Sequence, residues 1–121
     1  MSANGHNPFF TPIGSLEDAH ALIQSEPYVF VYIGSPHCGV CHALKPQLAA
    51  RLAEHQQQVH FIELDASALP EVASQFHALT LPVLLLFIHA KERLRAARFV
   101  NTAAFKDDFE RAINADWSAF N

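Results

Sequence analysis

The segment His37–His42, HCGVCH, holds the only two cysteines of this 121-residue chain, Cys38 and Cys41. The pattern C-x-x-C-H is that of covalent haem attachment, and a C-x-x-C pair also serves zinc binding and thiol–disulfide exchange. The same segment therefore supports three unrelated chemistries. The composition of the chain and the elements around the cysteines have to distinguish among them.

The composition is that of one globular domain. Half of the residues are hydrophobic, and residues 1–121 are long enough for a single core, with residues 1–8 predicted to be a flexible tail. The net charge of −4 argues against a nucleic-acid or membrane partner, since phosphate binding requires clustered Lys and Arg. The N-terminus lacks the pattern of a secretory signal, and the longest apolar run, Leu81–Ile88, is too short to cross a bilayer. We therefore expect a cytoplasmic protein, in which such a cysteine pair is more often catalytic or metal-binding than structural.

Hydrophobic periodicity predicts strands alternating with helices. Strands are expected at about 9–13, 28–33, 59–64, 81–88 and 93–100. Helices are expected after Ser15–Asp18, along the apolar stripe Val40, Leu44, Leu48 and Leu52, around Val72 and Phe76, and from a capping Thr102 onward. This order predicts an α/β fold with a central mixed sheet flanked by helices, mostly parallel through βαβ units, with an antiparallel C-terminal hairpin. The alternating basic residues Lys91, Arg93, Arg95 and Arg98 are predicted to lie on one solvated strand face.

In open α/β sheets the working site lies at the carboxyl ends of the strands, and Cys38 follows the strand 28–33 directly. Haem is disfavoured because its attachment takes place outside the cytoplasm and because the segment lies between a buried strand and a helix. Zinc is disfavoured because a structural site needs four ligands. Here only His37 and His42 flank the pair, and they cannot easily turn toward the same ion. The sequence thus predicts no metal site.

The dithiol interpretation uses most of the context. Cys38 would begin a helix, where free backbone N–H groups and the positive end of the helix dipole stabilise a thiolate. Cys41 would lie one turn later, shielded and within disulfide reach, to resolve the mixed disulfide formed by Cys38. Gly39 leaves room near the sulfur. A cationic His37 or His42 would lower the pKa of the attacking thiol, which is a hypothesis.

Several motifs together make residues 9–115 resemble the thioredoxin family. The apolar strand FVYI precedes the cysteines, CGVC opens a helix, and Pro46 follows Cys41 by five positions. The segment TLPVLLLF resembles the family's cis-proline stretch, and its Pro82 follows Cys38 at the family's usual interval of 44 positions. A lone C-x-x-C pair would be a weak signal, but the four features together are specific.

The resemblance implies a thiol–disulfide oxidoreductase that reduces protein or mixed disulfides. Cys38 would be the nucleophile and Cys41 the resolving cysteine. Leu81 and Pro82 would form a cis peptide facing the dithiol, and with Gly39 and Val40 they would contact the substrate. No cofactor is implied, since the electrons are carried by the two sulfur atoms. The expected partners are disulfide-containing proteins and an electron donor, either a flavoprotein disulfide reductase or a low-molecular-weight thiol.

The chain also departs from the family pattern. Thioredoxins carry W-C-G-P-C-K where this chain has H-C-G-V-C-H. The family's buried acid falls at Tyr32 and its lysine partner at Phe61, and a base for the second cysteine would have to come from His42 or Glu63. Two alternatives therefore stay open: a redox-weak binding or adaptor module that keeps the fold, and a zinc-binding protein.

Overall fold

The computed structural model describes residues 8–120, so the predicted tail at 1–8 lies outside the described residues except for Pro8. The element order is the predicted one. The elements are β1 (Thr11–Pro12), α1 (Leu16–Ser25), β2 (Tyr28–Gly34), α2 (Gly39–Leu52), η1 (Ala53–His55), β3 (His60–Asp65), α3 (Val72–Gln75), β4 (Val83–Ile88), β5 (Lys91–Ala97), α4 (Thr102–Asn114) and η2 (Ser118–Phe120). No helix in this part of the chain is long and apolar enough to cross a membrane.

The five strands form one mixed sheet in the order β1-β3-β2-β4-β5. Strands β1, β3 and β2 are parallel, whereas β4 is antiparallel to both β2 and β5. The α/β fold with a mixed sheet is confirmed. The expectation that the third long strand would continue the parallel series is wrong, because β4 runs against its neighbour β2.

The connection from β3 to β4 explains the reversal. A parallel strand requires the chain to travel back along the whole sheet before it re-enters. Helix α3 has four residues and spans about 6 Å, whereas the six-residue β4 spans roughly 20 Å. The chain stays at one edge of the sheet along this connection and enters β4 from there, as the pairing of Val83 with Ile33 shows.

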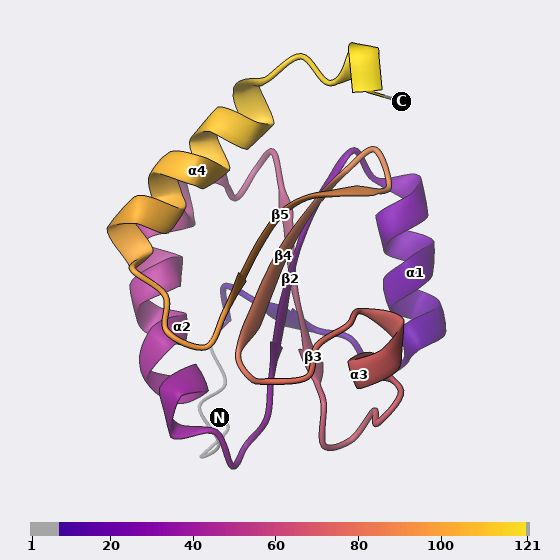
Figure 1. The fold of residues 1–121 in the computed structure, drawn as a ribbon, viewed down its shortest axis with the longest axis vertical. Coiled ribbons are helices and arrows are strands. Elements are labelled where there is room, and N and C mark those ends of the chain that lie inside the picture. Colours follow the sequence, from indigo (N-terminus) through magenta and orange to yellow (C-terminus); the bar gives the residue numbers. More distant parts are fainter. Residues whose placement is uncertain (1–7, 121) are drawn as a thin grey trace.

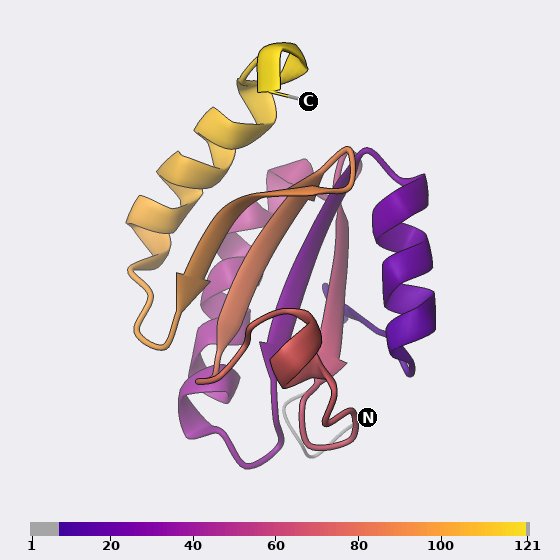
Figure 2. The same ribbon diagram turned by 45° about the vertical axis from the view of Figure 1, so that its right-hand side comes forward.

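Helices cover both faces of the sheet, with α2 and α4 on one face and α1 and α3 on the other (Figures 1 and 2). Strand β2 supplies both cores by alternation: Phe30 and Tyr32 pack toward α2 and α4, while Val29, Val31 and Ile33 pack toward α1 and α3. A strand buried on both faces reads as a continuous apolar run, which is why β2 was recognisable from the sequence.

The helix starts follow side-chain capping. The Ser15 hydroxyl accepts a hydrogen bond from Asp18 N at 3.1 Å, as the capping-box pattern predicts. At α4 the cap is Asn101, whose Oδ1 accepts from Ala104 N at 3.0 Å, and not the predicted Thr102. Thr102 is buried inside the first turn, and its Oγ1 accepts instead from Arg51 Nε at 2.9 Å. Its hydroxyl thus joins α4 to α2.

Strand β5 differs from the predicted solvated basic face. Its register with β4 shifts at one position, so that Arg93 is an extra residue between Glu92 and Leu94. Such a bulge reverses the side-chain alternation. The Arg93 guanidinium therefore stacks 4.4 Å from the Trp117 ring centroid beside α4, while Arg95 donates to Phe76 O at 2.7 Å on the other face.

Candidate active site

The antiparallel entry of β4 brings two distant segments to one edge of the sheet. Ile33, near the end of β2, pairs with Val83, the first residue of β4. The cysteine segment that follows β2 and the Leu81–Pro82 segment that precedes β4 therefore lie at the same edge. The Leu81–Pro82 peptide bond is cis. Both Cys38 and Leu81 pack against the core beneath α2.

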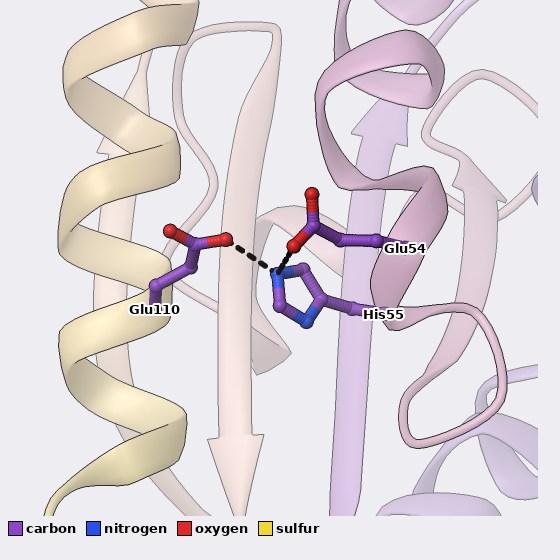
Figure 3. A group of neighbouring side chains, drawn as sticks. All are labelled: Glu54, His55 and Glu110. Atoms are coloured by element: carbon purple, nitrogen blue, oxygen red, sulfur yellow. Dashed lines mark hydrogen bonds and ion pairs between the residues drawn. The ribbon is translucent and has the colours of Figure 1, made fainter.

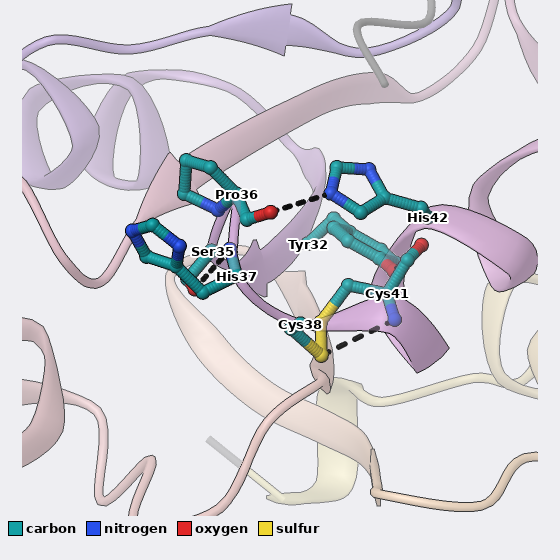
Figure 4. Close-up of a disulfide and its surroundings, with 7 residues drawn as sticks. All are labelled: Tyr32, Ser35, Pro36, His37, Cys38, Cys41 and His42. Carbon is teal, nitrogen blue, oxygen red and sulfur yellow. Dashed lines mark hydrogen bonds between the residues drawn. A yellow bond between two sulfur atoms is a disulfide. The ribbon is translucent and has the colours of Figure 1, made fainter. Parts of the chain in front are cut away.

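Cys38 and Cys41 form a disulfide, with their Cα atoms 5.3 Å apart (Figure 4). Cys38 is the N-cap of α2, and its Sγ accepts a hydrogen bond from Cys41 N at 3.2 Å. Cys41 is 2% exposed, whereas Cys38 is only partly buried. The more accessible sulfur is thus the one that a helix N-terminus stabilises as an anion.

The remaining predicted neighbours surround this disulfide. Gly39 is exposed. The sequence predicts that Val40 belongs to the buried stripe of Leu44, Leu48 and Leu52, but this is wrong, because the Val40 side chain is 44% exposed. Val40 lies in the first turn of α2, beyond the end of the sheet. His42 Nε2 donates to Pro36 O at 2.9 Å, and the exposed His37 ring points away from the sulfurs (Figure 4). Their influence on Cys38 stays a prediction.

Two residues beneath the disulfide, Tyr32 and Gly34, were not among the site residues predicted from the sequence. The Tyr32 hydroxyl donates to Cys41 O at 2.6 Å, which ties β2 to the first turn of α2. Burial, with the nearby negative charge of Glu63, raises the pKa of Tyr32 above its usual range. A Cβ atom added at Gly34 would lie 3.1 Å from Cys41 Sγ, so a side chain at this position would press on the disulfide.

A cavity of about 170 Å³ opens beside Cys41, and an ion pair lies in its wall. Lys45 Nζ, on α2, is 2.8 Å from Glu63 Oε1, on β3, and the two side chains are 8% and 21% exposed. Glu63 was one of the two bases considered from the sequence. Its partner Lys45 was not foreseen, because a lysine in an amphipathic helix is ordinarily solvated.

A second titratable group lies away from the disulfide, where η1 meets α4 (Figure 3). His55 Nε2 is 2.7 Å from Glu110 Oε2 and 3.9 Å from Glu54 Oε2. Within residues 8–120 these three side chains form the group whose ligand atoms are close enough to share an ion, and neither cysteine belongs to it. Lys106 Nζ already lies 3.2 Å from Glu54, so the group is an ion-pair network between helices.

Comparisons with known proteins agree with this geometry. The family model Thioredoxin matches residues 16–115. Thioredoxin-like protein YdfQ of Bacillus subtilis (strain 168) is 38% identical over 101 residues, which cover 84% of this chain and 89% of that protein. NADPH-dependent thioredoxin reductase 3 of Arabidopsis thaliana is 30% identical over 93 residues, 77% of this chain but 17% of that protein. The crystal structure of thioredoxin from Trypanosoma brucei brucei shares the fold, with a TM-score of 0.77 at 18% identity, over 95% of this chain and 98% of that one.

The fold, with a CXXC disulfide at the start of α2, defines a thiol–disulfide oxidoreductase. Because the family model covers most of the chain and a relative of similar length is well over 30% identical, the chain belongs to the thioredoxin family.

Proposed function

We propose that the protein reduces disulfide bonds in other proteins, or mixed disulfides between proteins and small thiols, through Cys38 and Cys41. The observation that carries this proposal is the unequal placement of the two sulfurs. Cys38 is accessible at the N-cap of α2 and accepts a backbone N–H, while Cys41 is buried behind it.

The geometry supports one order of events. In the reduced protein the Cys38 thiolate attacks a substrate disulfide, and one substrate sulfur leaves with the electron pair of the broken bond. Cys41, one helical turn away, then attacks Cys38 Sγ and releases the second substrate sulfur as a thiol. The protein ends with the Cys38–Cys41 disulfide, and the substrate ends with two thiols.

The surroundings of Cys38 support the reducing direction. Strongly oxidising dithiols owe their potential to a highly stabilised thiolate. In the described part of the chain, the hydrogen bond to Cys38 Sγ comes from Cys41 N alone, and the rings of His37 and His42 are turned elsewhere. We therefore expect the Cys38 thiolate to be less stabilised than in a strong oxidant, which favours a protein that gives electrons away.

The exposed surface at this sheet edge supports a polypeptide substrate. Val40, Leu79 and Phe99 are large apolar side chains that are 44%, 84% and 80% exposed. Val40 adjoins the disulfide, Leu79 precedes the cis peptide, and Phe99 follows Arg98, whose N–H bonds Pro82 O at 2.8 Å. Within residues 8–120 the Leu81 backbone makes no hydrogen bond, so its polar groups are available to pair with an extended chain.

The proposed electron donor is a flavoprotein disulfide reductase or a low-molecular-weight thiol, and the proposed location is the reducing cytoplasm. The similarity to a segment of an NADPH-dependent thioredoxin reductase supports a donor of the first kind. The two donors are separated by coupling turnover to NADPH oxidation with a thioredoxin reductase, or to a glutathione system.

An insulin-reduction assay with dithiothreitol tests the function. The wild type should accelerate precipitation of the insulin B chain, and Cys38→Ser should abolish the acceleration. Reduced Cys41→Ser, freed of dithiothreitol and then mixed with insulin, should retain the first attack and accumulate a covalent mixed disulfide with the substrate, visible on a non-reducing gel. A wild type no faster than the dithiothreitol background would contradict the proposal and favour the binding-module alternative.

A further inference from the structure

The ion pair of Lys45 and Glu63 lies beside Cys41, where it can take part in proton transfer. We propose that Glu63 accepts the proton that the Cys41 thiol loses, through the cavity that both residues line, and that Lys45 is the positioning residue that holds the Glu63 carboxylate in place. This inference rests on the proposed function, because it assigns the proton transfer of the second thiol–disulfide exchange.

Cys41 needs such an acceptor because of its burial. It is 2% exposed, and a thiolate is disfavoured away from water. For Cys41 to attack Cys38, its proton must leave while the sulfur electron pair forms the new S–S bond. The bond between Cys38 and the substrate breaks, and its electron pair leaves on the substrate sulfur. That sulfur is reduced and takes a proton from solvent, while Glu63 returns its own proton to solvent through the cavity.

The cavity suits this transfer. It has a volume of about 170 Å³ and its wall includes Cys41, Lys45 and Glu63. A cavity of this size holds several water molecules, and the polar groups around it give them hydrogen-bond partners. Lys45 follows Cys41 by one helical turn on α2, so the helix holds the Lys45 ammonium group at a fixed position relative to Cys41 Sγ.

The other titratable side chains around the cavity are already engaged. They are Tyr32, His42 and Asp65. The Tyr32 hydroxyl donates to Cys41 O, and His42 Nε2 donates to Pro36 O. Asp65 Oδ1 accepts from both the Ser67 N–H and the Ser67 hydroxyl, at 2.9 and 2.6 Å.

Glu63 is the exception. Its buried Oε1 lies 2.8 Å from Lys45 Nζ, but no donor in the described part of the chain is aligned to form a hydrogen bond with it. Because Oε1 is out of reach of water, the other carboxylate oxygen, Oε2, which makes no hydrogen bond within residues 8–120, is the atom available to a proton from the cavity. The carboxylate is held by charge and is free to accept a proton.

Stopped-flow reaction of the reduced protein with dithiobis(nitrobenzoate), an aromatic disulfide, separates the two steps. Attack by Cys38 releases a first nitrothiobenzoate at a rate proportional to the reagent concentration. Attack by Cys41 releases a second at a rate independent of it. In Glu63→Gln we expect the first phase to stay within about threefold of wild type and the second to slow at least about tenfold near pH 7. The deficit should shrink steadily as the pH rises above about 8.5, because hydroxide then competes with Glu63 for the thiol proton.

Two further variants complete the test. Glu26→Gln removes an acid paired with His60 on the surface, 3.0 Å away, and should leave both phases unchanged. Should Glu63→Gln fold poorly, the double substitution Lys45→Met, Glu63→Leu replaces the pair by apolar side chains and should show the same slow second phase. A second phase at the wild-type rate, or a deficit equal at every pH, would overturn the inference. A wild type without a first phase would contradict the proposed function itself.

Discussion

Gly34 occupies the last position of β2, where the backbone passes directly beneath the disulfide. An added Cβ would lie 3.1 Å from Cys41 Sγ and 3.2 Å from Tyr32 Cε1, and both neighbours are fixed in the core. We expect Gly34→Ala to lower the free energy of unfolding by about 1–3 kcal/mol, the usual cost of overpacking. Denaturant unfolding of the oxidised protein measures it.

The matched control is Gly14→Ala, since nothing lies within 4 Å of a Cβ at Gly14. Its unfolding free energy should stay within about 1 kcal/mol of wild type. Equal changes in the unfolding free energy for the two substitutions would show that the contact with Cys41 is not what requires glycine at position 34.

Tyr32 gives a prediction with a defined pH dependence. At neutral pH, Tyr32→Phe should destabilise the protein by about 1–2 kcal/mol, because the hydroxyl loses its bond to Cys41 O. The pKa of Tyr32 is raised by burial and by Glu63, so the unfolded chain releases this proton first as the pH increases. The wild type therefore loses stability above about pH 10 by up to about 1.4 kcal/mol per pH unit, and Tyr32→Phe lacks this loss.

Unfolding curves of both proteins at several alkaline pH values check this sign. The stability difference between wild type and Tyr32→Phe should narrow above about pH 10. A difference that is constant, or that widens, would contradict the burial of a neutral phenol beneath the active site.

At the scale of elements, the contact between η1 and α4 depends on His55. Its ring lies against Phe109, with centroids 5.4 Å apart, and Nε2 is 2.7 Å from Glu110 (Figure 3). A double-mutant cycle of His55→Ala and Glu110→Ala should give a coupling free energy of about 0.5–1 kcal/mol. The same cycle with Glu54, which is more exposed and 3.9 Å away, should give about 0.3 kcal/mol or less. Equal coupling in the two cycles would contradict the observed geometry.

The order of elements was predictable because each long element carries a strong local signal. The continuous apolar run of β2 and the cap at Ser15 are recognisable from neighbouring residues alone. The direction of β4 was not predictable in this way, since it depends on how far α3 carries the chain. Yet this direction is what places Pro82 beside the cysteines, because a parallel strand would begin at the opposite edge.

The candidate site also contains some residues that the sequence predicts and others that only the folded structure shows. The cysteines and Pro82 are recognisable because their residue types and spacing are characteristic. Glu63 was only one of two candidate bases, and its pairing with Lys45 could not be predicted, because the two charged residues meet beside Cys41 only when folding buries both. The bulge that turns Arg93 toward Trp117 is equally a product of tertiary packing.

At the scale of the whole molecule, the fold places the Cys38 sulfur at one edge of the sheet. Two apolar cores lie on either side of the sheet, and the disulfide closes the end of the core beneath α2. Large apolar side chains at this edge of the sheet remain exposed. The molecule is thus suited to brief contacts with polypeptide disulfides.

The reduction potential of the Cys38–Cys41 pair, measured by equilibration in dithiothreitol or glutathione redox buffers, tests this account most directly. Because one backbone N–H binds Cys38 Sγ, we expect a potential closer to that of thioredoxin, about −270 mV, than to that of a strong oxidant, about −120 mV. We also expect the oxidised form to be more stable to denaturant than the reduced form. A potential above about −180 mV, with the reduced form the more stable, would contradict a reductase.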